Sequence, residues 1–218
     1  MSDGNIRARF AREAPIADVR VQLTDKRLQH IEHAVYNRQR GLTIIVEDVF
    51  DPHNLGAITR TADAIGIQHI HYSAPEFHDA NRVGKFSSST ANKWMDYSYH
   101  GQSVEPAIID LKKEGYQIVA TVISDDAKSL YDVDWTQYDK VAILVGNEHS
   151  GISQQSIESA DIPITIPMRG MTQSLNVSVA TAIILSEIVR QREASAINFR
   201  LSDDDATALL EKLIRLAY

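Results

Sequence analysis

Three short groups of polar residues and glycines follow apolar, strand-like segments, and their residue types are the best suited to chemistry in this chain. The last group is the most informative, because after the run 162–166 come Pro167, Gly170, Ser174 and Asn176, and an apolar helix-like segment then begins. Side-chain groups and backbone N–H donors are thereby gathered where a strand ends and a helix begins. Open α/β folds usually bind ligands at such a junction. The sequence therefore predicts a ligand site here, although Ser174 and Asn176 are also good helix caps.

The first group has the spacing Asn54-x-Gly56-x-x-x-Arg60 and leads into a second helix-like segment. Arg60 stands two positions after the apolar residue Ile58. Successive helix residues step by about 100°, so the Arg60 side chain points roughly away from the buried stripe. Two interpretations stay open, a solvated helix arginine and a cation that reaches an anionic substrate.

The second group, Gly146-x-Glu148-x-x-Gly151, also lies between a strand-like run and a helix-like one. Two glycines five positions apart permit a tight backbone loop around a ligand. Glu148 is suited to anchor that loop by accepting hydrogen bonds from backbone N–H groups. An ordinary strand–loop–helix connection would look the same, so this group is informative only together with the others.

Alternating strand and helix patterns must position these three groups. The expected strands are 42–49, 67–72, 116–124, 140–145 and 162–166, and the expected helices are 24–39, 54–66, 103–114, 153–160, 175–192 and 203–216. Residues 74–100 have no clear pattern. Strands separated by helices predict an α/β fold, with a mostly parallel sheet flanked by helices on both faces. The helix 175–192 is apolar nearly all round, so we expect burial on more than one side, in the core or at a subunit interface.

The composition excludes several classes of protein. No apolar run reaches the roughly 18 residues of a membrane span, and the first residues lack the apolar region of a secretory signal. The chain has no cysteine, which excludes disulfides, cysteine–zinc sites and a cysteine nucleophile, and which fits a cytoplasmic protein. The net charge of −7 argues against a nucleic-acid partner, but residues 1–40 carry eight Lys and Arg against five Asp and Glu.

Common signatures of other chemistries are missing. The chain has no GxGxxG, no GxxxxGK[ST], no GxSxG and no HExxH motif. His69 and His71 share one face of an expected strand, and His30 and His33 share one side of an expected helix. Two histidines without a third ligand make a poor metal site, so no metal is expected.

Taken together, the three groups are far more specific than any one of them. Asn-x-Gly-x-x-x-Arg, Gly-x-Glu-x-x-Gly and Ile-Pro-Met-x-Gly-x-x-x-Ser-Leu-Asn-Val-Ser occur in this order, and over residues 42 to about 193 the chain resembles the SpoU/TrmH branch of the SPOUT RNA 2′-O-methyltransferases. Within the branch, the stretch MRGMTQSLNVSVA looks most like the tRNA (guanosine-18-2′-O) enzymes. The resemblance implies a SPOUT fold with a C-terminal trefoil knot, S-adenosylmethionine as cofactor, and a homodimer packed on the helix 175–192.

The resemblance also implies a domain organisation and a set of site residues. Residues 1–40 would be a basic helical extension, 41–193 the methyltransferase domain, and 194–218 a C-terminal helical extension. The cofactor site would use Thr121, Leu144, Gly146, Ile166, Met168 and Leu175, and the catalytic site Arg60 with Asn54, Glu148, Ser174 and Asn176. The RNA contacts would come from Arg20, Lys26, Arg27, Arg38 and Arg40.

The implied reaction is methyl transfer to a ribose 2′-OH, which needs a positioned nucleophile and a proton acceptor. A guanidinium keeps its proton in proteins, so Arg60 is expected to grip the neighbouring phosphate rather than act as the base. The first expectation is a tRNA enzyme acting on guanosine 18 of the D-loop. The alternatives are another tRNA position or ribosomal RNA, a non-catalytic RNA-binding factor, and a small-molecule α/β enzyme.

Overall fold

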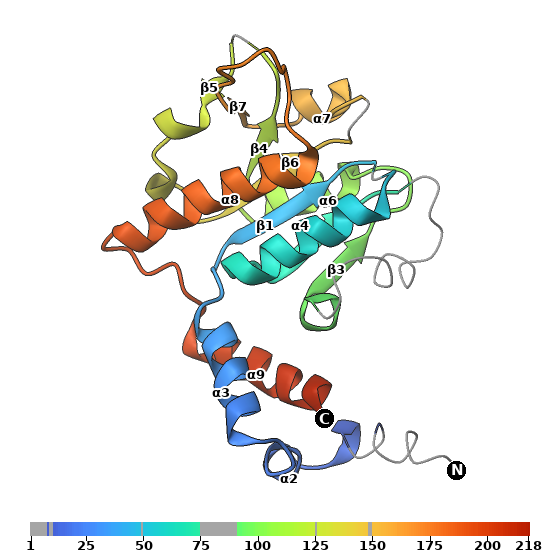
Figure 1. Ribbon diagram of the computed structural model, residues 1–218, viewed down its shortest axis with the longest axis vertical. Coiled ribbons are helices and arrows are strands. Elements are labelled where there is room, and N and C mark those ends of the chain that lie inside the picture. The colour runs from blue at the N-terminus through green and yellow to red at the C-terminus, as the bar shows by residue number, and fades with distance from the viewer. Residues whose placement is uncertain (1–7, 9–10, 49, 75–90, 125, 148–149) are drawn as a thin grey trace. The chain divides into compact units, whose positions relative to one another are not determined.

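The computed structural model describes residues 8, 11–48, 50–74, 91–124, 126–147 and 150–218 (Figure 1). Contacts divide the chain into two compact units. One consists of Met1–Arg38 together with Arg200–Tyr218, and the other is Gln39–Phe199. The two terminal segments, which the sequence analysis treats as separate extensions, thus belong to one unit. All three motif groups lie in the larger unit.

The larger unit is built on a sheet of seven described strands, and every strand pairing in it is parallel. The strands are β1 (Leu42–Val46), β2 (His69–Tyr72), β3 (Asp96–Tyr99), β4 (Gln117–Thr121), β5 (Lys128–Ser129), β6 (Val141–Val145) and β7 (Ile162–Thr165). Their order is β3-β2-β1-β6-β4-β7-β5. The α/β fold with a parallel sheet is therefore confirmed.

Helices cover both faces of this sheet, as Figure 1 shows for α4, α8 and α6. The helices of the unit are α4 (Pro52–Ile65), α6 (Glu105–Lys113), α7 (Gln154–Glu158) and α8 (Val177–Ala194), with short 3₁₀ turns η1 (Ala91–Trp94), η2 (Leu130–Asp132) and η3 (Trp135–Gln137). The fully buried strand β1 serves both faces, because Ile44 and Val46 pack with residues of α4 and α8 whereas Ile45 packs with α6.

Helix α4 begins two residues earlier than the sequence analysis predicts. Asp51 caps it by accepting a hydrogen bond from the His53 N–H, and Pro52 fits the first turn, where no N–H partner is needed. Asn54 therefore lies inside the first helical turn. The helix ends at Gly66, whose φ of 95° favours glycine.

Strand β3 lies in the segment that showed no pattern, so the sequence analysis missed it. Its side chains are mostly half-buried, so its residues DYSY do not form the apolar run from which a buried strand can be predicted. Tyr97 of β3 donates a hydrogen bond to Thr59 Oγ1 of α4 at 3.1 Å, and burial raises the pKa of Tyr97 to about 12. The missed strand thus helps to hold the helix that carries Asn54 and Arg60.

The C-terminal end of α8 is fixed by a buried arginine. Arg192 is 2% exposed, and its guanidinium donates hydrogen bonds to the carbonyl oxygens of Arg40, Gly41, Tyr138 and Asp139 and lies over the Phe199 ring. Desolvation by this burial lowers the pKa of Arg192 to about 10. One side chain thereby joins α8 to the segments that lead into β1 and β6.

The smaller unit contains the helices α2 (Ile16–Arg20), α3 (Asp25–Tyr36) and α9 (Asp203–Ala217). Helix α9 packs on both α2 and α3, with Val19, Ile31, Val35 and Leu213 among the buried residues. Arg215 of α9 also donates hydrogen bonds to two backbone carbonyls of the N-terminal segment. The amphipathic helices predicted at 24–39 and 203–216 are confirmed.

Candidate functional site

The first and third motif groups meet through a side-chain hydrogen bond. Asn176 is the N-cap of α8, and its Oδ1 accepts hydrogen bonds from the N–H and the Oγ of Ser178 at 2.9 and 2.6 Å. The other end of the same amide, Nδ2, donates to Asn54 Oδ1 at 3.1 Å. Two residues separated by 122 positions are thus brought together where α4 and α8 begin. Asn176 serves both as a helix cap and as a member of the predicted site.

Arg60 lies on α4, six residues or about one and two-thirds turns beyond Asn54, and its side chain is exposed. Within the part of the chain that the structure describes, the Arg60 guanidinium has no hydrogen-bond or ion-pair partner. The neighbouring Thr59 is buried and receives the hydrogen bond from Tyr97, so the helix is held while the arginine stays accessible. This arrangement suits a cation that engages a partner from outside the chain.

The described residues of the second motif group come close together after β6. A Cβ on Gly146 would lie 2.0 Å from the carbonyl carbon of Gly151, so only glycine allows this approach. Asn147 and Gly151 exchange two backbone hydrogen bonds, and Asn147 Oδ1 accepts from the Ser150 N–H at 2.8 Å. The predicted residue Glu148 lies outside the described residues.

The predicted cofactor residues gather at the carboxyl end of three adjacent strands. Thr121 ends β4, Gly146 follows β6 and Ile166 follows β7, and these strands lie in the order β6-β4-β7. Parallel strands bring their carboxyl ends to the same sheet edge. Leu144 lies within β6, and its fully buried side chain packs in the core cluster that includes Ile108 of α6.

The loop between β7 and α8 is open to solvent. Met168 is 38% exposed and Met171 is 100% exposed, whereas Leu175 is half-buried. Ser174 is exposed and lies two residues before the Asn176 cap. Two apolar methionine side chains are thus exposed on one loop. Exposed apolar surface of this kind suits contact with another molecule.

The predicted RNA-contacting residues are divided between the two units. In the smaller unit Lys26 and Arg27 are exposed on α3, Arg20 forms an ion pair with Glu32, and Arg38 is only 1% exposed. In the larger unit Arg40 binds both carboxylate oxygens of Asp139, at 2.7 and 3.2 Å. The cations thus differ widely in how accessible they are.

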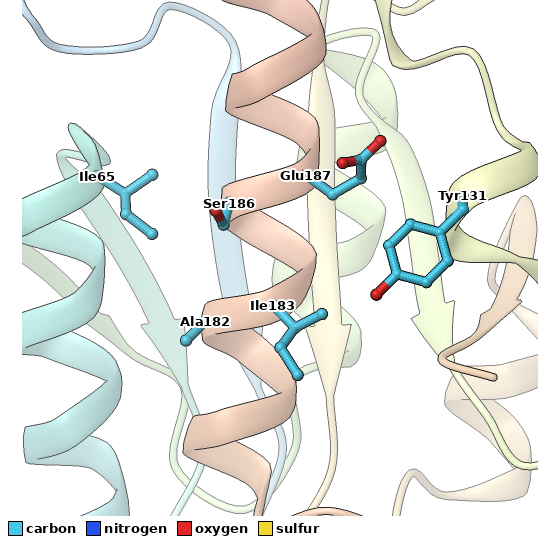
Figure 2. A pocket seen from close by; sticks show the side chains of 6 residues that line it. All are labelled: Ile65, Tyr131, Ala182, Ile183, Ser186 and Glu187. Atoms are coloured by element: carbon cyan, nitrogen blue, oxygen red, sulfur yellow. The ribbon is translucent and has the colours of Figure 1, made fainter. Parts of the chain in front are cut away.

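An open depression of about 520 Å³ lies beside the exposed side of α8 (Figure 2). Its lining residues are Ile65, Tyr131, Ala182, Ile183, Ser186 and Glu187. Figure 2 shows Ile65 of α4 and Tyr131 of η2 on opposite sides of α8. None of the predicted site residues lines it. The depression is therefore separate from the Asn54–Asn176 contact.

Glu47, which has a buried carboxylate beside the glycine loop and is 5% exposed, was not predicted from the sequence. The available signal was an acidic residue directly after the strand-like run LTIIV. Within the described ranges, no three His, Asp or Glu side chains are arranged to hold a metal ion. No helix among the described residues is long and apolar enough to span a membrane.

Comparison with known proteins places these observations in a family. The family model described as the SpoU rRNA methylase family matches residues 41–186. A tRNA (guanosine(18)-2′-O)-methyltransferase from Aquifex aeolicus is 37% identical over 190 residues, covering 86% of this chain and 88% of the relative. The protein of the same name from Escherichia coli K12 is 42% identical over 165 residues, covering 75% and 69%.

Solved structures agree with the sequence relatives. The A. aeolicus TrmH/SpoU tRNA modifying enzyme superimposes with a TM-score of 0.75 at 35% identity, covering 87% of this chain and 95% of that one. The SpoU methyltransferase AviRb from Streptomyces viridochromogenes, in complex with the cofactor AdoMet, gives 0.63 at 27% identity, with 75% and 62% covered. Since the family model spans the sheet and all three motif groups, the chain belongs to the SpoU rRNA methylase family.

Proposed function

We propose that this protein transfers a methyl group from S-adenosylmethionine to a ribose 2′-OH of RNA, with guanosine 18 of the tRNA D-loop as the target. The observation that carries the proposal is the Asn176–Asn54 hydrogen bond, which joins the substrate-side motif to the loop predicted to hold the cofactor. The names of the A. aeolicus and E. coli relatives support the choice of tRNA and of guanosine 18.

The residues at the carboxyl ends of β4, β6 and β7 fit S-adenosylmethionine. Half-buried Ile166 and Leu175, with the partly exposed Met168, offer apolar contacts for an adenine ring, and the closed loop at Gly146 offers backbone groups for its polar edges. The AdoMet complex of AviRb supports this choice of cofactor. When bound, the cofactor supplies an activated methyl group. Thr121 and Leu144 complete the proposed site.

The chain's own residues then have to present the 2′-OH. In our proposal Arg60 grips the phosphate next to the target ribose with its two-pronged guanidinium, which matches a phosphate bidentately. Asn54 holds the ribose, and its amide is oriented by Asn176. The proton leaves to the phosphate or to a water, because the guanidinium does not accept it. Ser174 helps to shape the same site, and the resemblance assigns Glu148 to it as well.

For RNA contact we propose Lys26 and Arg27 first, because both are exposed on α3. Arg20 and Arg40 join them by exchanging their carboxylate partners for phosphates. Arg38 is left out because its side chain is buried. Contacts of this kind position an RNA without reading its sequence, and they weaken as salt is added.

We also propose that the protein is a cytoplasmic homodimer that pairs through α8 and that its chain carries the trefoil knot of the SPOUT fold. Val179 is 47% exposed and Tyr131 is 54% exposed, and Ile183 lines the depression of Figure 2. A second copy of α8 would bury these apolar groups, in line with the all-round apolar sequence of the helix.

The test is transfer of a labelled methyl group from S-adenosylmethionine to unmodified total tRNA, with the product nucleoside mapped. We expect 2′-O-methylguanosine at position 18, and none with a transcript in which that guanosine is replaced. Methylation of ribosomal RNA but not of tRNA would mean that ribosomal RNA is the substrate. Binding of RNA without methyl transfer to either would favour a non-catalytic RNA-binding factor.

A further inference from the structure

Glu47, the residue directly after β1, carries a buried carboxylate that is bonded to the first turn of α7. Its Oε2 accepts a hydrogen bond from the Ser153 N–H at 2.9 Å, and its Oε1 accepts from Ser153 Oγ and Ser156 Oγ, each at 2.7 Å. Glu47 is 5% exposed and Ser156 is 4% exposed. A carboxylate is costly to bury without such donors, so the three hydrogen bonds are what keep it in place.

Through these contacts Glu47 holds both ends of the loop 146–152. At one end its backbone N–H donates to the carbonyl of Val145, the residue before Gly146, at 2.9 Å. At the other end its carboxylate binds Ser153, the N-cap of α7 and the residue after the loop. A single residue thus fixes the separation and direction of the two loop ends, while Asn147 and Gly151 close the loop internally.

The chain turns sharply just after Glu47. Asp48 has a φ of 52°, a left-handed conformation that is uncommon for a residue with a side chain. Its N–H donates to Ser73 Oγ at 2.8 Å, and its Oδ1 accepts from the same hydroxyl at 3.0 Å. The turn leads toward Asp51 and the start of α4, which carries Asn54. In sequence, Glu47 thus directly precedes the turn before α4, the helix that carries the substrate-side motif.

We propose that Glu47 is a positioning residue that sets the geometry of the glycine loop for cofactor binding, acting through Ser153 and Ser156 and contacting neither substrate nor cofactor. The inference rests on the proposed function, because the loop matters for catalysis only if it binds S-adenosylmethionine. In enzymes, a misplacement of about 1 Å in a binding site costs on the order of 100-fold in rate, so small changes in the loop are expected to matter.

The test compares Glu47→Gln with a matched control, Glu158→Gln. Glutamine keeps the size of Glu47, but one of its ends presents N–H donors, so it cannot accept from both Ser153 N–H and the two hydroxyls. Glu158 is an exposed carboxylate on α7, the helix whose first turn binds Glu47. We expect the Glu47 variant to raise the dissociation constant and the KM for S-adenosylmethionine about tenfold, with the KM for tRNA within about twofold. The control is expected to change neither.

Amide hydrogen exchange of the loop gives a readout that is independent of activity. Exchange at Asn147, Ser150 and Gly151, whose N–H groups are bonded within the loop, is expected to speed up in the Glu47 variant. If exchange rises but the wild-type chain binds no S-adenosylmethionine, the proposed function is wrong while the hold of Glu47 on the loop is supported. If exchange stays unchanged, the positioning role is wrong whatever the activity.

Ser156→Ala is the second variant, in case the Glu47 change prevents folding. It removes one of the three donors, so we expect a smaller loss of cofactor affinity in the same direction. The double variant with Glu47→Gln and Ser156→Ala should bind the cofactor no more weakly than Glu47→Gln alone, since both changes disturb the same hydrogen bonds. A lower melting temperature with an unchanged dissociation constant and unchanged KM values would mean that Glu47 is purely structural, and would overturn the proposal.

Discussion

At the scale of single residues, the Asn176 amide has two ends with different roles. Its oxygen caps α8, and its nitrogen holds Asn54. A carboxylate in the same place would keep the oxygen and lose the donor. Asn and Asp are about equally good helix N-caps, and a negative charge favours a helix N-terminus.

We therefore predict that Asn176→Asp separates folding from catalysis. Its free energy of unfolding, measured with urea, should stay within about 0.5 kcal/mol of the wild type, whereas Asn176→Ala should lose about 1 kcal/mol with the cap. Turnover should fall sharply in both. If the Asp variant keeps wild-type turnover, the hydrogen bond to Asn54 has no catalytic part.

Arg60 gives a second prediction at this scale. Lysine keeps the charge but lacks the planar two-pronged donor, so Arg60→Lys should lose about 100-fold in kcat with little change in stability. Single-turnover methylation of tRNA measures this loss directly. Lys113→Ala, which removes an exposed cation on α6, is the control. Near-normal turnover of the lysine variant would contradict the bidentate grip.

At the scale of elements, α8 depends on its last turn as much as on its cap. Arg192 satisfies carbonyl groups in the segments before β1 and β6, and these groups would be left unbonded without it. We predict that Arg192→Met costs about 3 kcal/mol or more of unfolding free energy. Arg190→Ala, two residues earlier on the exposed side, removes only the ion pair with Glu187 and should cost less than about 1 kcal/mol in the same urea titration. Equal stability of the two variants would show that the buried arginine is dispensable.

Strand β2 and the residue directly after β3 carry a stacked histidine cluster that makes stability depend on pH. The His71 ring stacks on His69 with centroids 4.3 Å apart, and His71 Nδ1 lies 3.2 Å from His100 Nε2. Burial, followed by His69 and His100, lowers the pKa of His71 from 6.5 to about 3. Burial also lowers the pKa of His100, against the opposing effect of Asp110.

Because the folded-state pKa is depressed, protonation favours the unfolded chain. The stabilising contribution of neutral His71 is complete above about pH 6.5 and is lost as the pH falls toward 3. We predict that the unfolding free energy of the wild type falls between pH 7.5 and 5.5, and that His71→Asn falls less steeply. His30→Asn, an exposed position on α3, should keep the wild-type slope. Parallel slopes for all three proteins would contradict this account.

The elements that could be predicted from the sequence are those with strong local signals. The apolar runs of β1 and β6, the helical period of α4 and the long apolar segment of α8 indicated the type and approximate bounds of these elements. Strand β3 could not be predicted, since its residues DYSY are polar and are held by β2 and by the Tyr97–Thr59 bond. The polar motifs could be recognised from the sequence as a candidate site, but the Asn54–Asn176 and Glu47–Ser153 hydrogen bonds could not be predicted, because each joins residues more than about 100 positions apart.

At the scale of the whole molecule, the proposed dimer makes a direct prediction. Ile183→Glu places a charge beside the depression of Figure 2, so we expect a monomer in analytical ultracentrifugation. Methyl transfer should fall together with dimerisation if the partner completes the site. Ile109→Glu, at a 46% exposed isoleucine on α6, is the matched control and should leave both unchanged. A dimer that survives the Ile183 change would place the interface elsewhere.

The order of the strands also determines when each strand can pair during synthesis of the chain. Strand β1 can pair early with β2, but its other neighbour is β6, with Leu42 opposite Val141. At a synthesis rate of about 5–20 residues per second, roughly 5–20 s pass between the making of the two strands. During that interval β1, the most apolar strand of the first half of the chain, has one unpaired edge. An unpaired strand edge can pair with another chain and aggregate, or be bound by a chaperone. The seam between β1 and β6, where Glu47 meets the glycine loop, is therefore closed late, and the site is assembled only after most of the chain exists.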